Sequence, residues 1–195
     1  FMERGEAFDL IGLSYYPFWH GTLDMLTNNM NDIAKRYGKD LIVAEVSMGY
    51  TMEDYKEYEK LSDEERKGYA TRPALVEKIE YPMTVQGQAT HIRNVVDTMV
   101  NKTTNGIGVF YWEGTWISSG GDSYEENLAL WQNHGSGWAT SYAAEYDPDD
   151  AGQWYGGCAV DNQAFFDKDG RATEALKVFA LVREGNDVPN TADAV

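Results

Sequence analysis

The chain has 195 residues, of which 43% are hydrophobic, and a formal net charge of −16. This hydrophobic fraction argues against a disordered chain, and no apolar run approaches the roughly 18 residues that a membrane span needs. The negative charge argues against nucleic acid and anionic membranes as partners, because both require a basic surface; a neutral glycan fits this charge better.

Three apolar segments predict strands that are buried on both faces. They comprise residues 8–16, 41–46 and 107–112. Continuous apolar runs of this length are typical of a parallel sheet covered by helices, and less typical of an antiparallel sheet with one wet face.

A helical pattern follows each predicted strand. In the first, apolar residues recur at helical spacing between Thr22, an expected N-cap, and Gly38, an expected stop. Thr84 is expected to cap the second, within which His91 is expected to be structural. Residues 172–184 predict the third helix.

The alternation of strand and helix predicts either an α/β barrel or a doubly wound sheet. No glycine-rich phosphate-binding turn follows any of the strands. Long loops with aromatic and polar residues follow them instead, at 17–21, 50–82 and 113–170. Loops of this length are more often functional than incidental, so a barrel is favoured.

A complete (β/α)₈ barrel needs roughly 200 to 250 residues, whereas three strand–helix units are visible here. We therefore expect residues 1–195 to be the carboxy-terminal part of a single catalytic barrel. The start at Phe1, without a signal peptide, fits a truncated or processed segment. Cys158 is the only cysteine, so the chain cannot form an internal disulfide.

Glu45 ends an apolar strand, where a carboxylate is costly unless it is hydrogen-bonded or faces a cleft. At the carboxyl end of a barrel strand, an acid of this kind indicates catalysis; the alternative is a Glu that pairs with Arg or Tyr in a core network. Alternation places Ser14 and Tyr16 on one face of the first strand. The Tyr16 hydroxyl is therefore expected to contact the carboxylate on the neighbouring strand.

Further candidate substrate-binding residues follow the first and third strands. Trp19 and His20 are expected to line the cleft, with His20 otherwise an ordinary loop residue. Trp112 is expected to form a floor on which a sugar ring stacks, or else to belong to the barrel core. Glu113 is a candidate for binding sugar hydroxyls, and Trp116 lies just beyond it.

Several long strings resemble glycoside hydrolase family 53, the endo-β-1,4-galactanases that cut the galactan of arabinogalactan and pectin. The resemblance covers residues 8–182, and the strings that carry it are residues 9–19, 41–47, 81–88, 106–113 and 135–152.

This resemblance implies that the three strands are the sixth, seventh and eighth of a (β/α)₈ barrel. It implies that Glu45 is the nucleophile of a retaining enzyme, that Tyr16 contacts this nucleophile, and that Trp112 is the stacking residue. The family's acid/base Glu follows an Asn, and no Asn-Glu pair occurs in this chain. Retention needs two carboxyl groups, so we expect the 195-residue chain alone to be inactive and to depend on the amino-terminal half of the barrel.

No cofactor is expected to be required, although calcium is a candidate. Asp147, Asp149 and Asp150 form a cluster of hard oxygen ligands, whose alternative is a solvated acidic turn. Bacterial members of the family bind calcium between the seventh and eighth loops, but residues 53–66 predict a helix where their ligand run would lie. Residues 167–170 predict a hairpin turn and not a calcium loop.

Two alternative functions remain open. One is a non-catalytic carbohydrate-binding domain, which the 6 Trp and 13 Tyr allow. The other is a different barrel glycanase, such as a β-mannanase or a xylanase, with the same strand-end Glu. The family and its polymeric substrate imply an extracellular or cell-surface location.

Overall fold

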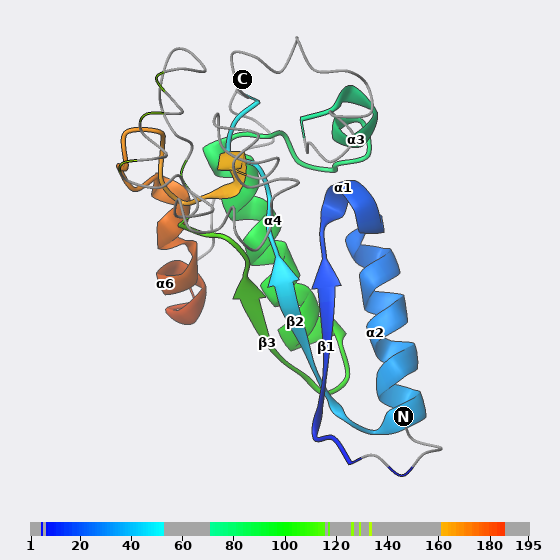
Figure 1. Cartoon of the computed structure of the whole chain (residues 1–195). Coiled ribbons are helices and arrows are strands. Elements are labelled where there is room, and N and C mark those ends of the chain that lie inside the picture. Colours follow the sequence, from blue (N-terminus) through cyan, green and yellow to red (C-terminus); the bar gives the residue numbers. More distant parts are fainter. Residues whose placement is uncertain are drawn as a thin grey trace.

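The computed structural model describes residue 5, residues 7–52, 71–115 and 161–185, and the single residues 117, 126, 129 and 133. Within them, three parallel strands form one sheet in the order β1-β2-β3 (Figure 1). The strands are β1 (Leu10–Tyr15), β2 (Asp40–Val46) and β3 (Gly106–Tyr111). All three predicted strands are confirmed.

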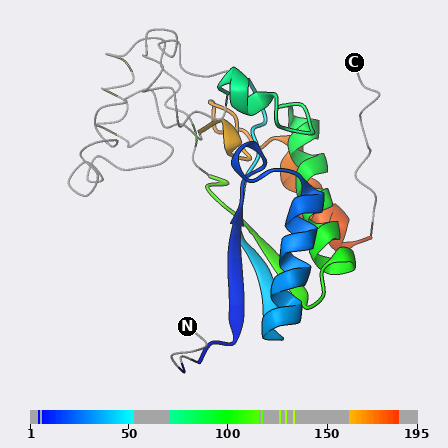
Figure 2. The same ribbon diagram turned by 90° about the vertical axis from the view of Figure 1, so that its right-hand side faces the viewer.

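The larger helices lie on one side of this sheet, as Figure 2 shows for α2, α4 and α6. These are α2 (Leu23–Tyr37), α4 (Val85–Asp97), which continues as a π-helical turn (Thr98–Lys102), and α6 (Val178–Arg183), which follows a 3₁₀ turn (Glu174–Lys177). The short elements are α1 (Pro17–His20), α3 (Pro73–Val76) and a 3₁₀ turn (Asp161–Gln163).

The predicted helix ends have the expected capping residues. The Thr22 hydroxyl oxygen accepts a hydrogen bond from the Met25 N–H at 3.3 Å, and that of Thr84 accepts one from the Gly87 N–H at 3.0 Å. Gly38 ends α2 in the left-handed conformation with φ 61°, which glycine adopts at little cost.

Two boundaries differ from the prediction. Residues 17–21 were expected to be loop but contain α1, which begins at Pro17, whose fixed φ suits a first helical position. The third helical segment begins at Glu174, because Ala172 pairs with Phe166 in an antiparallel bridge. This bridge closes the hairpin turn that was predicted between them.

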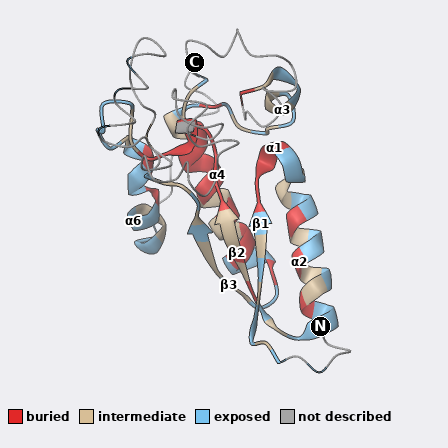
Figure 3. Cartoon of the chain, in the orientation of Figure 1, coloured by how far each residue is buried: buried red, intermediate tan, exposed pale blue. Residues whose placement is uncertain are grey.

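The main hydrophobic core lies between the sheet and its helices. Its buried members come from β1, β2, α2, α4 and the π-helical turn; they are Tyr15, Leu26, Met30, Ala34, Leu41, Val43, Val46, Val95 and Met99. Figure 3 shows that α4 is buried over much of its length. None of the helices in the described part of the chain has the length and apolar character that a membrane crossing requires.

Candidate active site

The carboxyl ends of β1 and β2 place a tyrosine against a carboxylate. Ser14 pairs with Glu45 in the β1–β2 ladder, and Tyr16 follows two residues later. The Tyr16 hydroxyl donates a hydrogen bond to Glu45 Oε2 at 2.8 Å. The contact expected from strand alternation is therefore present, although whether Glu45 is catalytic stays a prediction.

Tyr16 is held in place by the short helix that follows it. It is only 8% exposed, and its ring centroid lies 5.4 Å from that of Trp19 and 5.8 Å from those of Phe18 and His20. His20 Nδ1 accepts a hydrogen bond from the Tyr16 N–H at 3.0 Å. Because Pro17 starts a helical turn, the chain folds back and stacks these rings at the end of β1.

The Tyr16 hydroxyl stays protonated over the whole physiological pH range. Burial raises its pKa first, and the hydrogen bond to Glu45 and the negative charge of that carboxylate raise it further. A phenol in this state is a permanent donor. It therefore binds one oxygen of Glu45 and leaves the other available.

Trp112 directly follows β3 and lies at the same edge of the sheet. Its backbone N–H donates to the Val46 carbonyl at 2.9 Å, which fixes it beside the residue that follows Glu45. Its side chain is 42% exposed, and that of Trp19 is 49% exposed. Exposed indole rings at the carboxyl end of a sheet suit stacking on an apolar sugar face.

Glu113 is an unusual carboxyl group at the same edge. Its backbone has φ 61°, a left-handed conformation that a residue other than glycine seldom adopts. Burial raises the pKa of Glu113 to about 7, opposed by a hydrogen bond from Trp112 and supported by the charge of Glu45. Its Oε2 atom is buried and has no hydrogen-bond partner among the described residues. A buried carboxyl oxygen without a partner favours the neutral form of the group, in agreement with the raised pKa.

The site residues predicted from sequence thus fall into three groups. Tyr16, Glu45, Trp112 and Glu113 meet at the carboxyl ends of the strands, and Trp19 and His20 pack against Tyr16. The remaining predicted residues, Trp116, Asp147, Asp149 and Asp150, and the helix expected at 53–66 lie outside the described residues.

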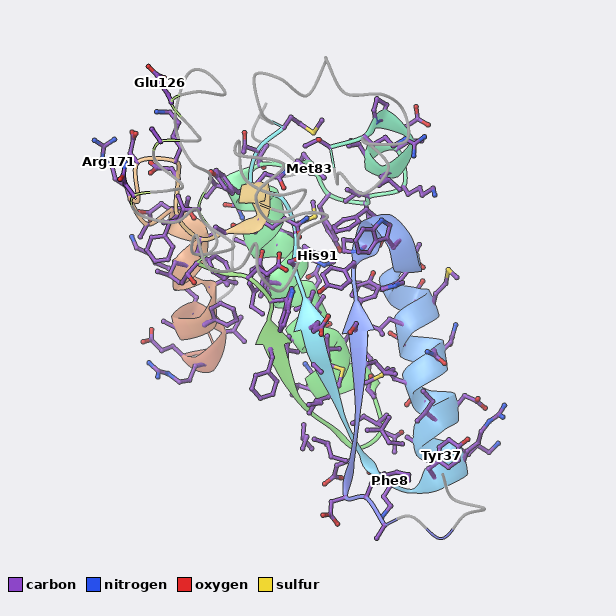
Figure 4. All side chains as sticks on the ribbon, in the orientation of Figure 1. Phe8, Tyr37, Met83, His91, Glu126 and Arg171 are labelled. Carbon is purple, nitrogen blue, oxygen red and sulfur yellow. The ribbon has the colours of Figure 1, made fainter. Side chains whose placement is uncertain are left out.

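No group of three metal-binding side chains is found in the part of the chain that the structure describes. His91 is fully buried on the sheet side of α4, where Tyr15 and Tyr81 flank its ring (Figure 4). Its burial is compatible with the structural role expected for it, which stays a prediction. Sequence reasoning missed the buried Gln88 and the Tyr111 hydroxyl, which contact each other and the backbone of Met48.

The sequence matches the model of glycosyl hydrolase family 53 over residues 1–179. This chain belongs to glycosyl hydrolase family 53. The family that the motifs indicated is thereby confirmed.

Relatives in this family include bacterial and fungal proteins. An endo-β-1,4-galactanase of Bacillus subtilis (strain 168) is 47% identical over 180 residues, which are 92% of this chain and 40% of the relative. A probable arabinogalactan endo-β-1,4-galactanase A of Aspergillus fumigatus (strain Af293) is 33% identical over 127 residues, 63% of this chain and 31% of the relative. This chain thus spans less than half the length of these relatives.

A solved structure gives the fold. The family 53 catalytic domain from Ignisphaera aggregans superposes with a TM-score of 0.64 at 31% identity, covering 93% of this chain and 41% of that domain. The three parallel strands with their helices are therefore part of a (β/α)₈ barrel, as predicted.

Proposed function

We propose that this chain supplies the nucleophile of a retaining endo-β-1,4-galactanase, and that Glu45 is this nucleophile. The observation that carries the proposal is the hydrogen bond of 2.8 Å from the Tyr16 hydroxyl to Glu45 Oε2 at the carboxyl ends of two parallel strands. In (β/α)₈ enzymes this end of the barrel carries the active site. Family membership and the named galactanase relatives support the substrate.

The two carboxylate oxygens of Glu45 would have different roles, which the contact with Tyr16 sets. Tyr16 binds Oε2 and fixes the orientation of the carboxylate, so Oε1 is the attacking atom. Oε1 forms a bond to the anomeric carbon while the bond from that carbon to the glycosidic oxygen breaks. The leaving oxygen takes a proton from a second carboxylic acid, and water then hydrolyses the glycosyl ester with that second group as base.

The second carboxylic acid is expected outside this chain. Glu113 has a raised pKa, as a general acid needs, but the family resemblance places the acid/base Glu after an Asn that this chain lacks. We assign Glu113 to hydrogen bonding with sugar hydroxyls, because it lies at the same edge as Trp112 and Glu45. The 195-residue chain alone should therefore release no sugar from galactan.

The proposed partner is neutral galactan, and the rest of the barrel is needed to complete the site. Trp112, and Trp116 beyond it, would stack on the sugar rings, and Trp19 and His20 would line the cleft beside Tyr16. A neutral polymer is compatible with the net charge of −16. A long polysaccharide is cleaved outside the cell, so we propose an extracellular or cell-surface location.

A test needs a protein of full length. We define the completed protein as the Bacillus subtilis relative in which the matching 180 residues are replaced by this chain. It should release reducing sugars from β-1,4-galactan and not from β-mannan or xylan, and NMR should detect the β-anomer of the new reducing end first. A preference for mannan or xylan would contradict the galactanase assignment, and initial release of the α-anomer would contradict retention.

The competing hypothesis is a non-catalytic carbohydrate-binding domain. It predicts that the completed protein binds galactan in a pull-down assay without releasing sugar. The unmodified relative, measured beside it, shows that the assay detects turnover.

A further inference from the structure

A buried amide lies at the carboxyl ends of β2 and β3. Gln88 of α4 is fully buried, and its Nε2 atom donates toward the Met48 carbonyl at 2.9 Å and the Tyr111 hydroxyl at 3.0 Å. The carbonyls of Gln163 and Ala164 lie at 3.1 and 3.2 Å from the same atom. The two hydrogens of one amide nitrogen thus serve four acceptors from three separate segments.

The Tyr111 hydroxyl occupies the centre of this arrangement. It accepts a hydrogen bond from the Met48 N–H at 3.1 Å, and it lies 2.6 Å from the Gln163 carbonyl, to which it donates. Burial keeps the phenol protonated, since it raises the pKa of Tyr111. We call these five residues, Gln88, Tyr111, Met48, Gln163 and Ala164, the Gln88–Tyr111 hub.

The strand ladder is irregular around Glu45. The β1–β2 register shifts between Leu13 and Ser14, and the β2–β3 register shifts between Leu41 and Ile42 and again between Val43 and Val46. Glu45 therefore pairs with Ser14 of β1 but with no residue of β3.

The hub links β2 and β3 just beyond the stretch of β2 that does not pair with β3. Met48 follows Glu45 by three residues, and Tyr111 immediately precedes Trp112. Met48 and Tyr111 both belong to the hub. Next to them, the Trp112 N–H donates a hydrogen bond to the Val46 carbonyl at 2.9 Å. The segments that carry the carboxylate and the indole are thus held by one buried set of hydrogen bonds.

We infer that Gln88 and Tyr111 are positioning residues that act through the backbone of β2 and β3. They keep Glu45 and Trp112 in the positions that the reaction requires. This inference rests on the proposed function, because it names the geometry that the reaction requires. A displacement of about 1 Å at a reacting group can cost roughly 100-fold in rate. The hub should therefore affect turnover more than it affects substrate affinity.

The test compares Tyr111→Phe with Ile92→Val in the completed protein. Tyr111→Phe keeps the ring and removes the hydroxyl. Ile92 is fully buried, lies on the same helix as Gln88 and belongs to a core cluster against which Tyr111 also packs, but its side chain can make no hydrogen bond, so Ile92→Val is a control for lost packing. Activity on galactan is measured at least about 15 °C below both melting temperatures, which circular dichroism provides.

Tyr111→Phe should lower kcat by about tenfold or more and change KM by less than about threefold, whereas Ile92→Val should leave kcat within about twofold. Gln88→Met, of similar volume, should lower kcat further because three carbonyls lose the hydrogen bonds that they accept from Gln88. If Tyr111→Phe melts lower but retains the kcat of Ile92→Val, the hub is merely structural and the inference is wrong. If the parent completed protein folds but does not turn over galactan, the proposed function is refuted. The positioning inference, which rests on that function, then fails as well.

Discussion

Glu113 should make the stability of the site depend on pH. Its pKa is about 7 in the folded chain against an ordinary value of 4.5. Between these two values the folded state binds more protons than the unfolded chain, so stability falls as pH rises through this window. The difference would correspond to about 3.4 kcal/mol, but the carboxyl group is only partly buried. Solvent screening reduces the expected loss to about 1–2 kcal/mol.

Glu113→Gln removes this titration while keeping an oxygen that can accept from Trp112. The variant should match the parent completed protein at pH 4, where the carboxyl group is neutral, and should be more stable by about 1–2 kcal/mol at pH 8. Urea unfolding at both pH values measures the difference, and Glu184→Gln, an exposed change at the end of α6, is the control. A Glu113→Gln variant that is no more stable than the parent at pH 8 would refute the reasoning.

Two further predictions concern Tyr16 and His91. Tyr16→Phe removes the hydrogen bond to Glu45, a bond to a charged group worth about 1.5–3 kcal/mol, so kcat/KM on galactan should fall roughly 10- to 150-fold. Tyr37→Phe on the exposed face of α2 should have no effect, and a Tyr16→Phe variant of full activity would contradict the orienting role. Burial lowers the pKa of His91 to about 3, so the contribution of His91 to stability should fall by about 2 kcal/mol between pH 6.5 and pH 5, partly offset in the parent protein by the gain from Glu113. His91→Leu should show a smaller loss over this range in urea unfolding, and an equal loss would show that His91 is not the group responsible.

The sequence predicts the elements whose signals are local. Buried parallel strands appear as continuous apolar runs, and the helix ends carry their own caps in Thr22, Thr84 and Gly38. The contact between Tyr16 and Glu45 is predictable as well, because alternation fixes the face of a strand and parallel strands end at the same edge.

The hub is not predictable in this way. Tyr111 lies in an apolar strand, and only the register of β3 against β2 shows that its hydroxyl reaches Met48. Gln88 is a polar residue within a helical stripe, where sequence patterns indicate a solvent face, yet tertiary contacts with four acceptors bury it. The left-handed backbone of Glu113 likewise has no signal in the sequence.

The most direct test of the central claim is galactan hydrolysis by the completed protein with Glu45→Gln, against the exposed Glu184→Gln as the matched control. Removal of a covalent nucleophile should reduce kcat by roughly four orders of magnitude or more, while the control keeps full activity. If Glu45→Gln keeps activity within about tenfold of the parent, Glu45 is a structural carboxylate paired with Tyr16, and the nucleophile lies elsewhere.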